Sequence, residues 1–255
     1  MMKILSILLA TLTLAACQNV PITGRSQLQM ISEGAEASLG LSAYQDVLQK
    51  EKLSHDPRLN ELVTRVGSRI AAATGRTDYK WEFRVIDNDK LANAFCLPGG
   101  KVAVYTGILP VTQDEAGLAA VIGHEVAHAI ARHGGERMSQ QLLIEGVALA
   151  AAVSAKDERK GELYATLLGV GATFGILLPY SRLHESEADR MGLIYMAKAG
   201  YDPRAARDFW LRMAANDGKK GKPPEWLSTH PADDKRIRQI EQWLPEALSH
   251  YRPVR

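Results

Sequence analysis

The spacing of apolar and polar residues predicts two helices at the start of the folded chain. Residues 33–52 and 57–73 both have helical periodicity. The second segment follows Asp56 and opens with Pro57, which is a typical N-cap and first helical position. Nearly everything after about residue 113 also has helical spacing. The pattern therefore predicts a protein in which helices dominate.

Between these helical segments the pattern changes to that of strands. Residues 79–86 alternate between apolar and polar side chains, as expected of a half-buried strand. A second strand is predicted over residues 101–105, directly after the turn formed by Pro98, Gly99 and Gly100. A few short strands followed by many helices indicate an α+β fold, mostly helical, with a small antiparallel sheet.

The first residues are typical of a targeting segment. Lys3 precedes an apolar run over residues 4–14, which is too short to span a bilayer. The run ends in Ala15, Ala16 and Cys17, which resembles the lipobox of bacterial lipoproteins. We therefore expect a signal peptide over residues 1–16, a lipidated Cys17 with a polar tether over residues 17–32, and a folded domain over residues 33–255. An ordinary signal peptide or a buried helix with an incidental cysteine is the alternative.

The residue after the cysteine is Gln18 rather than Asp. By the sorting pattern of such lipoproteins, Gln18 predicts a lipoprotein of the bacterial cell envelope, in the outer membrane and facing the periplasm. The lipid on Cys17 is then the expected attachment to the membrane.

Two later stretches are unusually apolar. They cover residues 146–153 and 163–178, and the charged run 156–160 separates them. The simpler interpretation is a helical hairpin packed on the core. The alternative is a hairpin that contacts a membrane or acts as a lid.

Composition narrows the possible classes of protein. Of the 255 residues, 46% are hydrophobic and 24% are charged, so a folded chain is expected rather than a disordered one. The formal net charge of +2 gives no basic field, and we expect no nucleic-acid partner. With only two cysteines, a disulfide scaffold and a four-cysteine zinc site are excluded. Cys96 is expected to be buried rather than reactive.

The strongest chemical signal is the sequence from His124 to His128, which has the form H-E-x-x-H. On a helix the two histidines lie one turn apart on the same face, so both can bind one cation. Glu125 lies beside that face and can reach a water molecule next to the metal. Apolar residues around the motif have helical spacing, and Gly134 with Gly135 is expected to end the helix.

Two histidines leave a tetrahedral cation short of ligands, so a third must come from elsewhere. His133 falls one residue early for the metzincin pattern, and we expect it at a helix end rather than on the metal. Glu185 and Asp189 form an i, i+4 pair that can give one carboxylate to the metal and the other to a ligand imidazole. Glu187 is two residues from Glu185 and points elsewhere.

Several motifs together resemble the HtpX and CAAX-prenyl-protease family of zinc metallopeptidases, in a short lipoprotein form. The matching segments are residues 93–100, 114–128, 185–189 and 228–231. The resemblance implies a zincin fold of the gluzincin type, with the sheet beside the metal-binding helix. It implies one zinc ion per chain held by His124, His128 and Glu185. It also implies Glu125 as the catalytic base and a catalytic or proton-donating Asp189.

The remaining candidates concern the transition state and the substrate. His230 precedes Pro231 and is expected near a positive helix end, where it stabilises the oxyanion or instead occupies the open metal position; a surface histidine is the alternative. Arg236 is expected to be solvated. The alternative is that it contacts the same region as His230. Residues 101–105 and 93–98 are candidate strands for backbone pairing with a peptide.

These features predict a zinc metalloendopeptidase that is anchored by lipid and cleaves extended or misfolded envelope proteins, in protein quality control. Its predicted partners are unfolded or extended substrates and, through Cys17, a membrane. The competing hypothesis is a lipid-anchored chaperone or assembly factor with a structural zinc site. The intact Glu125 argues against that alternative, because a structural site has no use for a base. The sequence indicates no oligomeric state.

Overall fold

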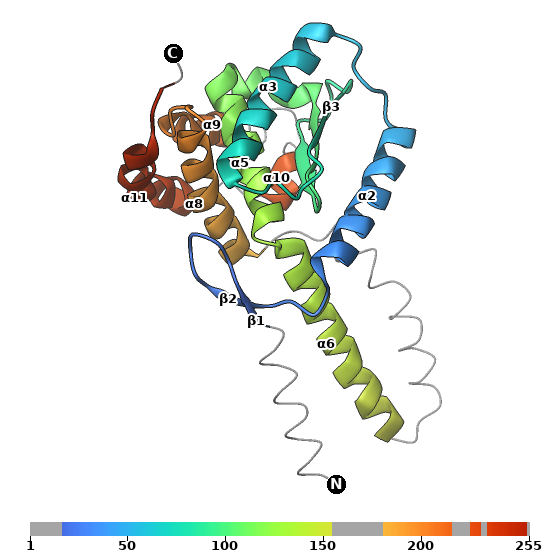
Figure 1. The fold of residues 1–255 in the computed structure, drawn as a ribbon. Helices are drawn as coiled ribbons and strands as arrows, with labels where there is room; N and C mark the ends of the chain where they lie inside the picture. The colour runs from blue at the N-terminus through green and yellow to red at the C-terminus, as the bar shows by residue number, and fades with distance from the viewer. Residues whose placement is uncertain (1–16, 155–180, 216–224, 231–233, 254–255) are drawn as a thin grey trace. The chain divides into compact units, whose positions relative to one another are not determined.

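The computed structural model describes residues 17–154, 181–215, 225–230 and 234–253 (Figure 1). The chain divides into two compact units, residues 1–36 with 132–178 (unit 1) and residues 37–131 with 179–255 (unit 2). The helices are α2 (Glu33–Lys50), α3 (Pro57–Thr74), η1 (Thr106–Ile108), α4 (Leu109–Thr112), α5 (Glu115–Ile130), α6 (His133–Ser154), α8 (Arg182–Lys198), α9 (Arg204–Ala215), α10 (Glu225–Thr229) and α11 (Asp234–His250). The strands are β1 (Cys17–Asn19), β2 (Ser26–Leu28), β3 (Glu82–Ile86), β4 (Ala94–Leu97) and β5 (Lys101–Tyr105).

Helix α5 is the centre of unit 2. It packs against α3, α8, α9 and strand β4, and every residue from Gly117 to Ile130 is buried. The helix begins where the Asp114 carboxylate accepts a hydrogen bond from the Gly117 N–H at 2.7 Å. A helix buried all round needs apolar residues on every face, and α5 has them except at the H-E-x-x-H motif. The three polar side chains of the motif are therefore the exception that requires a partner.

The sheet of unit 2 has the order β3–β5–β4, and α5 packs against its β4 edge. Strand β5 is antiparallel to β4 and parallel to β3. The α+β class, mostly helical with a small sheet beside the metal-binding helix, is confirmed. The antiparallel arrangement holds for the β4–β5 hairpin, whereas β3–β5 is parallel. The chain passes from β3 to the far side of β5 before it turns, and this crossover makes the β3–β5 pair parallel.

In unit 1, residues 17–32, which the sequence suggested as a polar tether, contain a β-hairpin. Strands β1 and β2 pair as an antiparallel hairpin. The hairpin region is bound to α6, because Arg25 donates to Glu136 at 2.6 Å and the Met30 N–H donates to the Ser139 hydroxyl at 2.8 Å. Side chains such as Gln27 are buried, which a solvated tether does not require.

The expectation that Gly134 and Gly135 end the motif helix is wrong. Helix α5 already ends at Ile130, Arg132 adopts a φ of 57°, and α6 continues through both glycines. A Cβ on Gly135 would lie 1.9 Å from the Glu36 carboxylate within unit 1. The glycine is therefore explained by the close approach of Glu36 rather than by helix termination.

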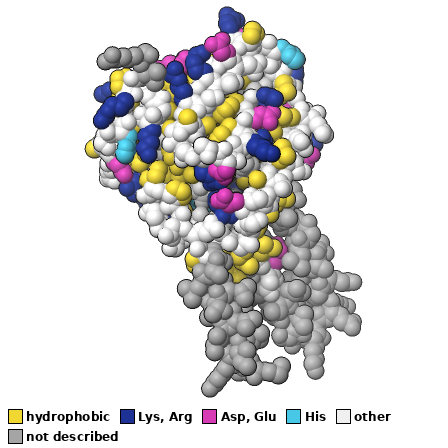
Figure 2. Space-filling view, viewed as in Figure 1, with side chains coloured by type: hydrophobic (Ala, Val, Ile, Leu, Met, Phe, Trp, Pro, Cys, Tyr) yellow, Lys and Arg dark blue, Asp and Glu magenta, His cyan; other side chains and the backbone are white. Residues whose placement is uncertain are grey.

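Helix α6 contains the first of the two apolar stretches, residues 146–153, which are helical as expected. The charged run 156–160, the second apolar stretch 163–178 and the predicted signal peptide lie outside the described residues. Among the helices that are described, none combines the length and the apolar character needed to cross a bilayer. On the face shown in Figure 2, basic and acidic side chains are interspersed.

Candidate metal centre

The motif helix brings His124, Glu125 and His128 into the interior of unit 2. Each is at most 3% exposed. The two imidazoles face each other along α5, and their Nε2 atoms lie 3.1 Å apart. The geometry agrees with the expectation that residues four apart share a helix face.

A close crossing of α5 and α8 supplies the third group. Gly123 and Gly192 face each other at the crossing, where a Cβ on Gly192 would lie 3.0 Å from the His124 backbone N. The absence of both side chains lets the helices approach closely. Ser181 is the N-cap of α8, and its hydroxyl accepts a hydrogen bond from the His184 N–H. The first turn of α8 presents Glu185 to α5.

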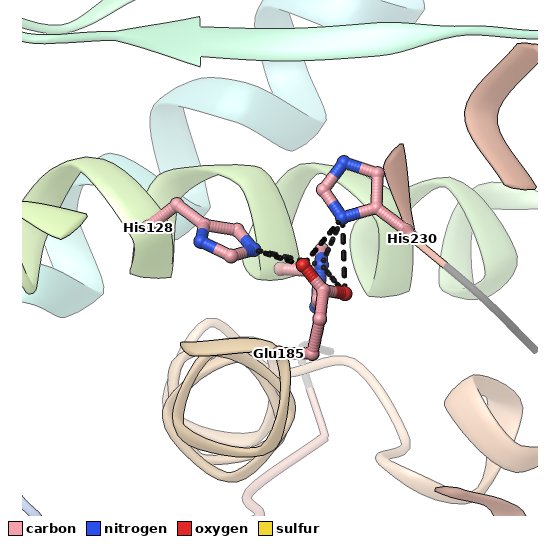
Figure 3. A group of neighbouring side chains, drawn as sticks. His128, Glu185 and His230 are labelled. Carbon is pink, nitrogen blue, oxygen red and sulfur yellow. Dashed lines mark hydrogen bonds and ion pairs between the residues drawn. The ribbon is translucent and has the colours of Figure 1, made fainter. Parts of the chain in front are cut away.

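Glu185 lies between the imidazoles of His128 and His230, as Figure 3 shows. One carboxylate oxygen is 3.3 Å from His128 Nε2, and the other is 3.4 Å from His124 Nε2. Burial of Glu185 favours the neutral acid, but the charges of His230 and Arg236 outweigh burial and hold the pKa of this carboxyl well below its usual range. Glu185 is therefore a carboxylate, which is the form that binds a cation.

His230 completes the cluster from α10. Its Nδ1 is 2.9 Å from a Glu185 oxygen and 3.2 Å from His124 Nε2 (Figure 3). In the structure His230 directly follows a helix, α10. Its N–H donates to the Trp226 carbonyl at 2.8 Å, so it lies at the C-terminal end of α10. Pro231 lies outside the described residues.

The spacing of these donor atoms fits a tetrahedral cation. Ligand atoms about 2.1 Å from a zinc ion at tetrahedral angles lie about 3.4 Å from one another. The four candidate donors come from His124, His128, Glu185 and His230 and lie within 4.8 Å of one another. The closest approaches between them are 2.9–3.4 Å. The donor set is three imidazole nitrogens and one carboxylate oxygen, and zinc prefers such ligands.

The charges of the cluster point to a divalent cation as well. Glu125, Glu185 and Asp189 are all buried, and the Arg236 guanidinium contacts two of them, Glu185 and Asp189. Without the imidazoles, three carboxylates and one guanidinium leave two negative charges, part of which a protonated His124 compensates when no cation is bound. Buried charge of this kind is costly unless it is paired. A cation of charge +2 balances it.

Asp189 orients one of the imidazoles. Its Oδ1 is 3.0 Å from His124 Nδ1, and both of its oxygens accept from Arg236 at 2.7 and 2.8 Å. A proton on Nδ1 leaves the Nε2 lone pair directed at the cluster. Because both oxygens of Asp189 are engaged, the geometry favours an orienting role over proton donation.

The same contacts affect the charge of His124 when no cation is present. Burial is the largest effect and lowers its pKa, but hydrogen bonds to Asp189 and Glu185 outweigh burial and raise the pKa to about 9. A cation bound at this position must therefore compete with a proton.

Arg236 is a residue whose position the sequence did not reveal, since it was expected to be solvated. It is 6% exposed, and its guanidinium lies 3.3 Å from the centre of the Trp210 ring. Its Nη1 contacts Glu185 at 2.9 Å in addition to the contacts with Asp189. One arginine thus links the two carboxylates of α8 that face the motif helix.

One carboxylate oxygen of Glu125 is directed at Trp226 of α10 and at His230. Its Oε1 accepts a hydrogen bond from the Trp226 indole N–H at 2.8 Å and lies 3.4 Å from His230 Nε2. Trp226 was not a candidate in the sequence, where a lone aromatic residue in a short helix carries no signal of such a contact.

The remaining sequence candidates are two possible metal ligands, a cysteine and two possible substrate-binding strands. Among the described residues, the group of possible ligands includes neither His133 nor Glu187, and Cys96 is buried as expected. Of the two candidate substrate strands, β5 is paired on both sides and is wrong as a free edge. Strand β4, within residues 93–98, is the sheet edge that packs against α5.

Comparisons with known proteins agree with this site. Residues 57–244 match the model of Peptidase family M48. The mitochondrial metalloendopeptidase OMA1 of Schizosaccharomyces pombe is 43% identical over 231 residues, which cover 89% of this chain and 66% of the relative. Human OMA1 is 30% identical over 249 residues, or 89% of this chain and 46% of the relative. The beta-barrel assembly-enhancing protease of Yersinia pestis is 29% identical over 223 residues, or 86% of this chain and 46% of the relative.

These relatives confirm the expected class of metalloendopeptidase and correct the expected location. The chain spans about two thirds of the fission-yeast relative and less than half of the human one. The relatives from fission yeast, budding yeast and human are all named as mitochondrial proteins. The prediction of a bacterial outer-membrane location facing the periplasm is therefore wrong. Its basis was a short motif at Cys17, whereas the similarity extends over most of the chain.

Proposed function

Because the chain belongs to peptidase family M48, we propose that it is a zinc metalloendopeptidase that cleaves extended or misfolded proteins. The observation that carries the proposal is the buried donor set of His124, His128 and Glu185, with Glu125 beside it. The narrower resemblance to the HtpX and CAAX-prenyl-protease type stays a prediction, based on the motifs at residues 93–100 and 228–231.

The ligands of the proposed zinc ion are His124, His128 and Glu185. Bound there, zinc supplies a Lewis acid that polarises a peptide carbonyl and lowers the pKa of water. The surplus negative charge of the cluster and the 2.9–3.4 Å approaches between donors support this assignment. Asp189 holds the His124 ring in the orientation that binding requires.

Glu125 is the proposed general base. It accepts a proton from the attacking water molecule while the water oxygen bonds to the peptide carbonyl carbon. When the carbon–nitrogen bond breaks, the same carboxylic acid returns the proton to the leaving amine. Glu125 is 3% exposed, so bulk water does not compete for its hydrogen bonds.

His230 has two possible roles, and they predict opposite outcomes. As a donor, its Nε2 would stabilise the negative charge that develops on the carbonyl oxygen. As a latch, its Nδ1 would fill the fourth ligand position, and the 3.2 Å approach to His124 Nε2 fits this role. Replacement of His230 by Ala lowers kcat if His230 is a donor and raises activity if it is a latch.

Strand β4 is the proposed binding edge for substrate. It pairs with β5 on one side only and lies along the motif helix. An extended peptide can add to such an edge through main-chain hydrogen bonds. Backbone pairing selects for extended chains rather than for particular side chains, which is why unfolded proteins are the proposed substrates. Cleavage of such chains suits protein quality control.

The proposed function is tested with casein as substrate and purified full-length chain. Wild type should cleave casein, and a zinc chelator should abolish the cleavage. The Glu125→Gln variant should retain one zinc per chain by metal analysis, yet lose about 10²–10⁴-fold in rate because the amide cannot accept the proton. If it retained zinc and cleaved casein at the wild-type rate, Glu125 would not be the base.

The same experiment separates the peptidase from the alternative of a chaperone or assembly factor with a structural zinc site. A chaperone should suppress aggregation of an unfolded protein equally well in wild type and in Glu125→Gln, and neither should cut it. A peptidase should yield fragments from wild type alone.

Attachment to a membrane through a lipid on Cys17 is proposed separately. Cys17 is exposed at the start of β1, and small residues precede it in the sequence. The Cys17→Ala variant should leave the membrane fraction and keep its peptidase activity. Protein that stays in the membrane pellet after a carbonate wash would show that another segment is the anchor.

A further inference from the structure

Trp226 makes a short hydrogen bond to the proposed base. Its indole Nε1–H donates to Glu125 Oε1 at 2.8 Å, and the side chain of Trp226 is fully buried. An indole N–H can only donate, so Glu125 is the acceptor in this hydrogen bond and the indole cannot take up its proton. The contact joins α10 to α5, and its two residues, Trp226 and Glu125, lie 101 residues apart in the sequence.

The indole has little freedom to move. It is stacked on the Trp210 ring with the ring centres 4.7 Å apart and an angle of 19°, and the Phe209 ring contacts it at 5.2 Å. The backbone N–H of Trp226 donates to the Ala92 carbonyl at 3.3 Å, just before β4. The donor is therefore fixed from two sides before any substrate binds.

We propose that Trp226 is a positioning residue that fixes the orientation of the Glu125 carboxylate. The inference rests on the proposed function, in which Glu125 is the base. The terminal torsion of a glutamate is broad, so a carboxylate without a partner samples many orientations. A fixed N–H on Oε1 selects one orientation and directs Oε2 to the water molecule. A base held in the productive geometry reacts faster than one that must find it.

The first test measures the hydrogen bond itself and does not depend on activity. The chain has four tryptophans, Trp81, Trp210, Trp226 and Trp243. Nitrogen-15 NMR of the zinc-bound full-length chain resolves their indole N–H groups, and the resonance lost in Trp226→Phe is that of Trp226. If that variant fails to fold, Phe substitutions at the other three positions identify the resonance by elimination.

Two variants of the acceptor then make opposite predictions. Glu125→Leu removes the acceptor, so the Trp226 resonance should shift and its proton should exchange faster with water. Glu125→Gln retains an acceptor oxygen, so the resonance should stay near its wild-type position. A Trp226 resonance that does not respond to Glu125→Leu would overturn the proposal.

The second test separates positioning from packing. Trp226→Phe should keep zinc and KM and lower kcat by about 10- to 100-fold, because the ring remains while the donor is lost. Trp210→Phe is the matched control, since it removes an equal part of the same stacked pair but not the donor to Glu125. Its kcat should fall less than that of Trp226→Phe. An equal fall in kcat in the two variants would mean that Trp226 acts through packing alone.

A double variant shows whether Trp226 acts through Glu125. In the Glu125→Gln background, Trp226→Phe should cause no further loss of the residual rate, because there is no base left to orient. An equal loss in both backgrounds would contradict the proposal. If instead Glu125→Gln alone cleaved at the wild-type rate, the proposed function would fail, while the NMR result would still report the hydrogen bond.

Discussion

Two buried arginines, one in each unit, show how a charged cluster that stabilises a fold differs from one that binds a ligand. Arg132 lies in unit 1 and Arg236 in unit 2, and both are at most 6% exposed. Each is paired with carboxylates that are also buried. The difference lies in what remains after these pairs are made.

The charges in the cluster of Arg132 are matched. Its guanidinium donates to both oxygens of Glu36, at 2.6 and 3.2 Å, to the Ile31 carbonyl at 2.6 Å and to Gln18. Its own carbonyl accepts from Gln29 at 3.0 Å. One buried carboxylate is balanced by one guanidinium, and no imidazole contacts the pair among the described residues. Such a cluster fixes the hairpin of unit 1 to the start of α6.

The charges in the cluster of Arg236 are not matched. Its guanidinium contacts Asp189 and Glu185, and Glu125 lies in the same buried space with three imidazoles. Burial and ion pairing alone therefore do not mark a ligand-binding site. A surplus of charge and of donor atoms does.

The largest effect is expected on zinc affinity, when a donor of the Arg236 cluster is removed. Glu185→Ala should lower zinc affinity by more than about 100-fold, whereas Asp189→Asn, which only misorients His124, should lower it by about 10- to 100-fold. Glu187→Ala should have the least effect, because Glu187 does not belong to the group of donors. The affinity is measured by competition with a fluorescent zinc chelator.

Each affinity is compared per folded molecule, with circular dichroism as the check on folding. Equal retention of zinc by Glu185→Ala and Glu187→Ala would contradict the ligand assignment and with it the contrast between the two clusters.

The positions found from sequence alone are those that depend on local geometry. His124 and His128, and likewise Glu185 and Asp189, are four residues apart, and helical spacing alone places each pair on one face. The helices themselves follow from apolar periodicity and from caps such as Asp56 with Pro57. These features require no knowledge of how distant segments meet.

The residues that were missed depend on contacts between segments that are distant in the sequence. Trp226 reaches Glu125 only because α10 packs on α5, and Arg236 is buried only because α11 packs on α8. The order of strands in the sheet is likewise set by a crossover, so alternation alone could not show that β5 is central and β4 is the edge. A hydrophobic pattern records burial but not the identity of the neighbour.

A smaller effect is expected in the charge-matched cluster of unit 1. Glu36→Leu leaves the guanidinium of Arg132 buried without its carboxylate and should lower the free energy of unfolding by about 3–5 kcal/mol. The Arg132→Met variant should cost less, because a carboxyl group can escape its charge by taking up a proton whereas a guanidinium cannot. The double variant should recover most of the loss. Urea unfolding at pH 7 measures all three.

The pH dependence sharpens this prediction. Burial raises the pKa of Glu36 above its ordinary value even though Arg132 opposes the shift. A carboxyl whose pKa is raised on folding contributes stability below its unfolded pKa and loses it as the pH rises through the folded pKa. Arg132→Met removes the opposing charge, so its deficit relative to wild type should shrink as the pH falls from 7 to 5. A deficit that grew in acid would contradict the pairing.

The smallest effect is expected at a third arginine, which has the same geometry as Arg236 but lies near the surface. Arg190 on α8 donates to both oxygens of Glu246 on α11 at 2.9 Å, yet the two side chains are 34% and 38% exposed. Solvent screens such a pair, so Glu246→Gln should lower the free energy of unfolding by less than about 1 kcal/mol at pH 7. The hydrogen bond from Arg190 lowers the pKa of Glu246, so this contribution is present above the unfolded pKa and is lost as the pH falls through the folded one. Urea unfolding at pH 7 and at pH 3 should therefore show a small difference that disappears in acid. A loss as large as that of Glu36→Leu would mean that burial is not what separates these arginines.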